Sequence, residues 1–241
     1  MFTNFSITKD NADSFFYELA KEYKKKTKFP LEIIVVGGGA IIIKYGFRLM
    51  SLDYDVLFSY KDDYVKQCIY NVANKLHIPS DWLNDDFIKS DSYTPKIRQY
   101  STFYKTFSNI LNVRLVEREY LIAMKLVSSS TREYKHDKSD IVGILIEEKK
   151  KGTPVSRQEI DTAIMNLYGK ADVVSEAMYQ NLDQMLSSED LEDLYQKTVE
   201  REQRIREELT ELEQQGMVVR RSNISDVVKT ITERIDKETK K

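Results

Sequence analysis

The pattern of apolar and polar residues changes along the chain near Gly152. Before that point, short β-branched runs alternate with stretches of helical spacing. Leu31 to Val36 predicts a buried strand, and Asp53 to Ser59, in which acids alternate with apolar residues, predicts a strand with one solvated face. After Pro154, apolar residues recur at helical spacing, which predicts helices throughout. The sequence therefore predicts a sheet-containing region followed by a helical one.

Glycine, proline and like charges divide this pattern into elements and domains. Gly37–Gly39 stops the first strand, and Gly46 ends the helix that follows. The run Lys149–Pro154 predicts a domain boundary. We expect an α+β domain over residues 1–150, in which helices flank a mixed sheet, and an all-helical domain over residues 151–241. The further predicted elements are a helix that opens at Asn11, helices over 40–45, 62–76, 119–128, 138–148 and 189–216, and a strand over 109–116.

Composition and charge narrow the class of protein. A net charge of −2, from 37 basic and 39 acidic residues, argues against a surface built entirely for nucleic acid. The one cysteine excludes an internal disulfide framework and favours a reducing compartment. The longest apolar run, Ile33 to Ile43, is far shorter than the roughly 20 residues that span a bilayer, and the first residues lack a signal-peptide pattern. We expect a cytoplasmic protein without membrane contact.

The residues best suited to chemistry follow the first strand and lie on the second. A buried strand that runs into Gly37 and Gly38 at a helix start presents backbone N–H groups, which suit phosphate oxygens. Asp53 and Asp55 are two residues apart on a strand, so their carboxylates point to the same side. Mg²⁺ prefers oxygen ligands and is commonly shared between one or two carboxylates and a substrate's phosphates. The glycine turn upstream favours such a site over a merely solvated strand face.

This constellation resembles the nucleotidyltransferase fold shared by DNA polymerase β, tRNA-nucleotidyl transferases and aminoglycoside nucleotidyltransferases. More narrowly, it is similar to a bacterial family related to abortive-infection and toxin-type nucleotidyltransferases. Three further segments carry the narrower resemblance: Ile78–Asp85, Glu119–Leu126 and the stretch from Arg132 to Ile141. The resemblance covers residues 30 to 148 and nothing after Pro154. It implies a nucleotidyltransferase-fold sheet domain.

The resemblance also implies roles for individual residues. Gly37 and Gly38 would bind the triphosphate of an NTP, and Ser51 would donate a hydrogen bond to a phosphate oxygen. Asp53 and Asp55 would hold Mg²⁺ and so take part in catalysis.

Four other residues complete the implied site. Lys125 matches the helix lysine of the toxin-type enzymes, which is implied to bind nucleotide phosphates as a point charge. Asp140 would orient Lys125 or serve as a third acid, and Asp137 is the rival for that role. Arg48 would bind the nucleotide or act as a structural partner of the aspartates.

Two departures from the family pattern affect these roles. Many members have Gly-Ser where this chain has Gly37-Gly38, so a hydroxyl contact to phosphate is missing unless Ser51 supplies it. Polymerase-like members carry a third aspartate on a later central strand, whereas the predicted strand 109–116 contains no acid.

The resemblance implies a Mg²⁺-dependent nucleotidyltransferase that moves a nucleoside monophosphate from an NTP to a hydroxyl of tRNA or of a protein. It also implies the toxin of a toxin–antitoxin pair, with an antitoxin protein as partner. The missing strand acid motivates an alternative, a catalytically degenerate nucleotide-binding module of the same fold.

A third hypothesis makes the C-terminal helices an arm through which the chain forms a homo-oligomer. Thr198 and Glu202 interrupt the heptads of that arm. Residues 189–215 hold ten acids and four bases, so this helix suits a dimer contact, an antitoxin dock or a solvated face better than RNA. Ser187 and Ser188 are its expected caps.

Two aromatic features have competing interpretations. Trp82 is expected to be a core anchor rather than a base-stacking residue. The segment from Lys96 to Phe107 mixes basic and aromatic residues, as single-stranded nucleic-acid surfaces do. The preferred interpretation of this segment is an edge strand with ordinary core aromatics.

Overall fold

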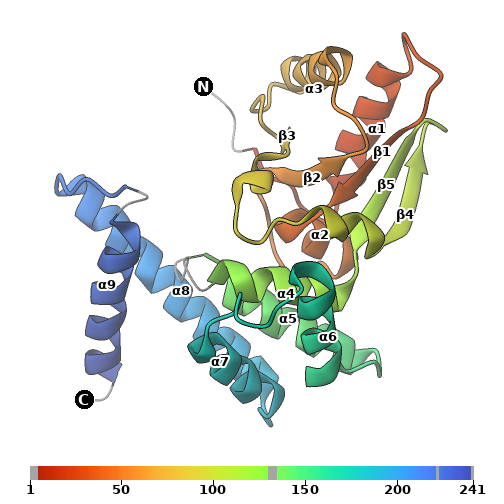
Figure 1. Ribbon diagram of the computed structural model, residues 1–241. Coiled ribbons are helices and arrows are strands. Elements are labelled where there is room, and N and C mark those ends of the chain that lie inside the picture. The colour runs from red at the N-terminus through yellow and green to blue at the C-terminus, as the bar shows by residue number, and fades with distance from the viewer. Residues whose placement is uncertain (1–4, 130–134, 221–222, 240–241) are drawn as a thin grey trace. The chain divides into compact units, whose positions relative to one another are not determined.

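The structure is a computed structural model, and it describes residues 5–129, 135–220 and 223–239 (Figure 1). Helices and strands alternate in the first half of the chain: α1 (Ala12–Tyr23), β1 (Leu31–Val35), α2 (Gly37–Lys44), β2 (Tyr54–Phe58), α3 (Asp63–Leu76), β3 (Leu83–Asn84), β4 (Ser101–Phe107) and β5 (Leu111–Val116). Helices follow: α4 (Arg118–Ser129), α5 (Asp137–Lys150), α6 (Arg157–Tyr168), α7 (Glu176–Leu186), α8 (Leu191–Gln214) and α9 (Ile224–Thr239). The predicted change from mixed to helical structure is confirmed in these residues.

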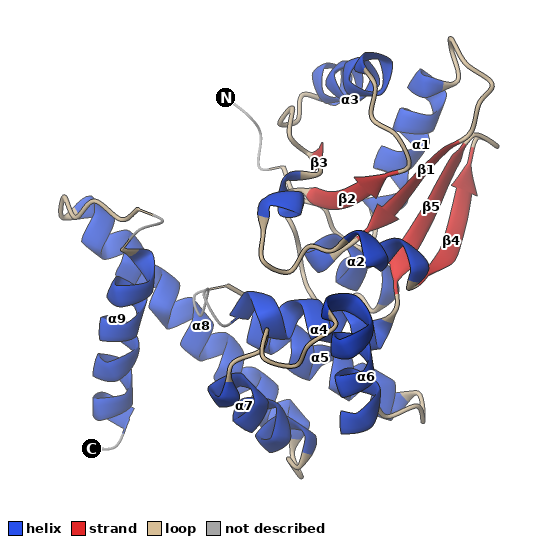
Figure 2. Cartoon of the chain, viewed as in Figure 1, coloured by secondary structure: helices blue, strands red, loops and turns tan. Residues whose placement is uncertain are grey.

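Within the described residues, the strands form a five-stranded sheet in the order β3-β2-β1-β5-β4 (Figure 2). β1 pairs antiparallel with β2 and parallel with β5, so the sheet is mixed, as predicted. β4 pairs antiparallel with β5 and forms one edge. Four of the five residues of both β1 and β2 are buried, as expected for strands covered on both faces.

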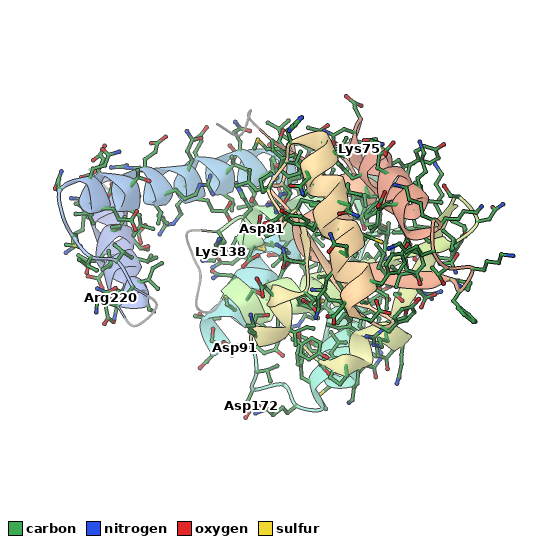
Figure 3. All side chains as sticks on the ribbon, turned by 90° about the horizontal axis from the view of Figure 1, so that it is seen from above. Lys75, Asp81, Asp91, Lys138, Asp172 and Arg220 are labelled. Carbon is green, nitrogen blue, oxygen red and sulfur yellow. The ribbon has the colours of Figure 1, made fainter. Side chains whose placement is uncertain are left out.

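Helices α1 and α3 pack against each other beside the sheet (Figure 2). The predicted apolar face of α1 is buried: Phe15, Phe16, Leu19, Ala20 and Tyr23. Asp62 caps α3, because its side chain accepts a 2.8 Å hydrogen bond from the N–H of Val65. An ion pair between Glu18 of α1 and Lys75 of α3 joins the two helices on the surface; Lys75 is labelled in Figure 3.

The chain divides into two compact units, and the division falls within α4. The first unit contains Met1–Met124 and Glu159–Lys170, and the second contains Lys125–Gln158 and Ala171–Lys241. The sheet belongs to the first unit, together with α6, whose Asn166 donates a 2.9 Å hydrogen bond to the hydroxyl of Tyr120. The domain boundary predicted at 149–154 stays a prediction.

In the second unit, α5 packs along α8, and α8 packs against α9. The apolar side chains that the sequence assigns to an interaction arm contact one another within the chain: Ile205, Leu209, Val228, Ile231 and Ile235. The predicted caps of α8 are wrong. Asp190 caps this helix by accepting a 2.9 Å bond from the N–H of Asp193. Ser187 instead ends α7, where its hydroxyl donates to the carbonyl of Asp183 at 2.7 Å.

Among the described helices, none combines the length and the apolar composition that crossing a membrane requires.

Candidate functional site

The turn after β1 places a glycine directly beside the carboxylate of Asp55. The antiparallel pairing of β1 with β2 continues one residue past β1, because the N–H of Val36 donates to the carbonyl of Asp55 at 2.9 Å. Gly37 follows with a φ of +58°, a left-handed conformation that favours glycine. A Cβ at Gly37 would lie 3.4 Å from Oδ2 of Asp55. The start of α2 and one predicted metal ligand are therefore neighbours, as the sequence predicts.

Asp53, the residue just before β2, accepts a hydrogen bond from a residue of β3. The pairing of β2 with β3 sets Asn84 opposite Asp55, and Nδ2 of Asn84 donates to Oδ2 of Asp53 at 3.3 Å. The same nitrogen donates to the carbonyl of Asp81 at 3.0 Å, in the loop after α3 where Figure 3 labels Asp81. Asp53 and Asp55 are both half-buried. Asn84 thus orients one of the two carboxylates.

Arg48 occupies the space where a side chain at position 38 would stand. A Cβ at Gly38 would lie 2.7 Å from Cζ of the Arg48 guanidinium. Nε of Arg48 donates to the carbonyl of Met50 at 3.2 Å, which holds the side chain over the turn. This packing gives a physical reason for Gly38, because the guanidinium fills the space that a Cβ would occupy.

Ser51 is placed by the N-terminal segment rather than by the glycine turn. It forms an isolated bridge with Ile7, with backbone hydrogen bonds of 2.7 and 2.9 Å in the two directions. Its exposed fraction is only 9%. Its predicted bond to a phosphate oxygen stays a prediction.

The second group of predicted site residues is a buried ion cluster around Lys125. Nζ of Lys125, on α4, lies 2.7 Å from Oδ1 of Asp137 and 2.7 Å from Oδ2 of Asp140, both in the first turn of α5. The exposed fractions of Lys125, Asp137 and Asp140 are 9%, 4% and 2%. Both rival carboxylates therefore contact the lysine at equal distance. All three residues belong to the second unit, whereas the glycine turn and the aspartates 53 and 55 belong to the first.

Glu202 of α8 supports this cluster and is a residue that the sequence analysis missed. Its carboxylate accepts bonds from the N–H of Ser139 at 3.1 Å and from the hydroxyl of Ser139 at 2.6 Å. Ser139 is the third residue of α5, and the N-cap residue His136 makes no side-chain cap bond. A side chain at the N-cap normally accepts that N–H. Glu202 does so from a distant helix, and its negative charge suits the helix N-terminus.

The other aromatic and basic features singled out in the sequence lie in the core or along the edge strand. Trp82 is fully buried, and its Nε1–H donates to the carbonyl of Ile69 at 3.2 Å, so it is a core anchor as expected. β4 is an edge strand, as expected, but the prediction of core aromatics is wrong for Phe103 and Tyr104, which are 60% and 36% exposed because one face of the edge strand is uncovered. Tyr100, just before β4, stacks on Tyr120 with ring centroids 4.1 Å apart. Lys105 pairs with Asp13 at 2.7 Å. Arg132, which opens the last segment of the family resemblance, lies outside the described residues.

The donor set of the first unit fits Mg²⁺ shared with a substrate. In the part of the chain that the structure describes, no three His, Cys, Asp or Glu side chains come together as a metal-binding group. Two half-buried carboxylates, one just before β2 and one on it, would supply oxygen ligands and leave positions for phosphate oxygens and water. The space above Gly37, which a Cβ would fill, is where such a phosphate could approach the backbone.

Compared with known proteins, the chain matches no protein-family model, no curated protein and no solved structure.

Proposed function

We propose that this protein is a Mg²⁺-dependent nucleotidyltransferase of the nucleotidyltransferase fold, which moves a nucleoside monophosphate from an NTP to a hydroxyl acceptor. One observation carries the proposal: the pairing of β1 with β2 sets the glycine turn against the carboxylate of Asp55, with 3.4 Å from a Cβ at Gly37 to Oδ2. A phosphate-binding turn and metal-binding acids are needed side by side for this chemistry.

The predicted site residues of the first unit have separate roles in the proposed reaction. The backbone at Gly37 and Gly38 binds the phosphates, and Asp53 and Asp55 hold the metal ion. Bound Mg²⁺ supplies charge neutralisation at the phosphates and activation of the attacking hydroxyl. The guanidinium of Arg48, which lies over Gly38, adds positive charge next to the phosphates.

The proposed transfer is a single displacement. The acceptor oxygen bonds to the α-phosphorus while the bond from that phosphorus to the pyrophosphate oxygen breaks. Pyrophosphate leaves, and the proton of the acceptor hydroxyl passes to water. Both aspartates are half-buried, so part of each side chain is accessible.

Lys125 and Asp140 enter the proposal through the family resemblance. The resemblance implies that Lys125 binds the nucleotide phosphates and that Asp140 orients Lys125. Lys125 contacts Asp140 and its rival Asp137 at 2.7 Å each, so the contacts support an orienting role for either carboxylate. A hydroxyl of tRNA or of a protein as acceptor, and an antitoxin as partner, extend the proposal along the same resemblance.

Pyrophosphate release tests the proposal. The purified chain is incubated with each of the four NTPs, Mg²⁺ and bulk tRNA, and the wild type is compared with the Asp53→Asn/Asp55→Asn variant. We expect release from the wild type and loss of at least 100-fold in the variant, the order of effect for removing groups that stabilise a transition state. The variant Asp63→Asn/Asp91→Asn removes two exposed acids elsewhere and should keep wild-type release. Equal release from all three proteins would refute the site.

One observation favours the degenerate module as a second candidate. β5, the strand parallel to β1, carries Asn112 and Arg114 but no acid, so no third carboxylate faces the site from that strand. This candidate predicts NTP binding, lost in the Asp53→Asn/Asp55→Asn variant, without pyrophosphate release from the folded wild type.

A further inference from the structure

A basic and aromatic surface lies at the end of β1 opposite to the glycine turn. The loop between α1 and β1 runs into Leu31, whereas Gly37 follows the other end of the strand. Together with the loop after β2, this loop borders a cavity of about 580 Å³. Four of the residues that line the cavity are aromatic: Tyr23, Phe29, Tyr60 and Tyr64. We call these aromatics, with Lys24, Lys26 and Lys28, the loop patch.

The lysines of the loop patch carry positive charge that the protein does not neutralise. Residues 21–28 hold five lysines and one glutamate, a local charge of +4 in a chain whose net charge is −2. Lys24, Lys26 and Lys28 are exposed, and none of the three pairs with a carboxylate in the described residues. Lys24 is instead held by the turn between β4 and β5, where its Nζ donates to the carbonyl of Ser108 at 2.9 Å.

Two aromatic rings of the loop patch stack on each other, and two others are exposed to solvent. The ring of Tyr23 stacks on that of Tyr64 at 5.6 Å, and the Tyr64 hydroxyl donates to the carbonyl of Tyr23 at 2.8 Å. Burial raises the pKa of Tyr64 to about 12, so its hydroxyl remains a donor at neutral pH. Phe29 stands out into solvent with 79% of its surface exposed, and Tyr60 with 39%.

Cation–π geometry links the charges to the rings. Nζ of Lys26 lies 5.7 Å from the centroid of the Tyr64 ring. Asp62 is the one acid among the residues that line the cavity. Its carboxylate accepts a hydrogen bond from the N–H of Val65 at the N-terminus of α3. Exposed rings with unneutralised lysines around them suit a ligand that has both flat aromatic groups and a chain of anionic charges.

We propose that the loop patch binds single-stranded nucleic acid. The lysines contact successive backbone phosphates, and unstacked bases pack on Phe29 and Tyr60 at the mouth of the cavity. A duplex keeps its bases stacked inside and presents only phosphates, so it would contact the lysines of the patch but not its aromatic rings. An acidic protein segment likewise uses the lysines alone. The proposal does not depend on nucleotidyl transfer, because the patch lies at the other end of β1 from Gly37 and needs no NTP.

Fluorescence anisotropy with a labelled 12-nucleotide RNA of mixed sequence tests the proposal, without NTP and at several salt concentrations. We expect Phe29→Ala to weaken binding of the RNA by about tenfold, since stacking of one base on an aromatic ring is worth about 5- to 150-fold. Phe29 is exposed, so the variant should fold as the wild type does. Phe103→Ala on β4, also an exposed phenylalanine at 60%, is the matched control and should bind as the wild type does.

The charge contribution is tested with Lys24→Gln/Lys26→Gln/Lys28→Gln. Loss of three phosphate contacts should reduce the slope of log affinity against log salt by about 2, because each contact to a single strand contributes about 0.7. Lys66→Gln/Lys89→Gln removes two exposed lysines that are each paired with an aspartate, and it should leave the slope almost unchanged.

Four outcomes would overturn the proposal. The first is that the wild type does not bind the RNA, and the second is that it binds a duplex equally well while Phe29→Ala has no effect. The third is that polyglutamate competes fully with the RNA. The fourth is that Phe103→Ala weakens binding and Phe29→Ala does not. Asp53→Asn/Asp55→Asn should bind the RNA normally even where pyrophosphate release is lost. This variant therefore separates a failure of the loop patch from a failure of the proposed transferase.

Discussion

Asp53 and Asp55 are half-buried acids, and Asp55 lies beside a glycine turn, whereas Asp137 and Asp140 are buried and both contact the buried Lys125. The first group exposes oxygen atoms and backbone to an incoming ligand. The second group places its charges where water is largely excluded, so the ion contacts themselves must offset the cost of removing the charges from water. Substitution should therefore affect ligand binding in the first group and the stability of the fold in the second.

The largest effect on stability is expected for Lys125→Met. This change leaves two buried carboxylates without the ammonium between them, and removing one partner of a buried ion pair costs about 3 to 5 kcal/mol. Asp53→Asn/Asp55→Asn should change the free energy of unfolding by about 1 kcal/mol or less, because both positions are half-buried and an asparagine oxygen can still accept the bond from Asn84. Urea denaturation followed by circular dichroism measures both variants.

A third variant tests the cause of this loss. In Lys125→Met/Asp137→Asn/Asp140→Asn, no charge of the cluster is left unpaired, so much of the lost stability should return. If Lys125→Met alone is as stable as the wild type, the buried ion contacts do not hold this region together, and the contrast between the two groups fails.

The next effect is expected for Glu202→Ala, which removes the acceptor of both bonds from Ser139. The buried N–H of Ser139 loses its partner and the hydroxyl keeps only its 3.2 Å bond to the carbonyl of His136, so we expect a loss of about 1 to 3 kcal/mol in the free energy of unfolding. Glu200→Ala, at an exposed position of the same helix, is the matched control and should cost little. A double-mutant cycle with Ser139→Ala should show that the two substitutions are not additive.

Glu202 also marks the limit of what the sequence could predict. As a glutamate in an apolar stripe, it reads in the sequence as an interruption of heptads, but it is 2% exposed and caps a helix 63 residues earlier. Asn84 is similar, since it reaches Asp53 across 31 residues through the pairing of β2 with β3. Such contacts depend on how distant elements pack, and a residue's own neighbours in the chain carry no sign of them.

Local patterns, in contrast, predicted the sheet and the glycine turn well. β1, the turn and β2 follow one another within a short stretch, so burial periodicity and three glycines are enough to place Gly37 near Asp55. The pattern could not show that Arg48 fills the space over Gly38, because the course of the segment between α2 and β2 is set by tertiary contacts such as the bridge from Ile7 to Ser51.

Adjacent glycines of this turn should differ in their response to substitution. A Cβ at Gly39 would lie 2.5 Å from the ring of Tyr54, which is fully buried and held by its hydroxyl bond to the carbonyl of Ala12. Gly39→Ala should therefore cost about 1 to 3 kcal/mol through overpacking. Gly38→Ala meets the flexible end of Arg48, which can move, so its cost should be clearly smaller. Thermal unfolding of both variants tests this order, and equal losses would contradict it.

The smallest effect concerns an ion pair of the same chemistry as Lys125 and Asp140, but on the surface. The hydrogen bond from Lys75 lowers the pKa of Glu18 below its ordinary value, against the opposing effect of burial. A carboxylate with a lowered pKa stabilises the fold above its unfolded pKa of about 4.5, and this contribution is lost as the pH falls through the lower, folded pKa.

Lys75→Ala should therefore reduce stability at neutral pH by less than about 1 kcal/mol, because the lysine side chain is 57% exposed and exposed pairs are weak. The difference between Lys75→Ala and the wild type should shrink as the pH falls below about 4.5, since protonated Glu18 no longer gains from the lysine. Unfolding measured from pH 7 to pH 3 tests this. A loss at pH 7 as large as that of Lys125→Met would show that burial does not separate the strong ion contacts of this protein from the weak ones.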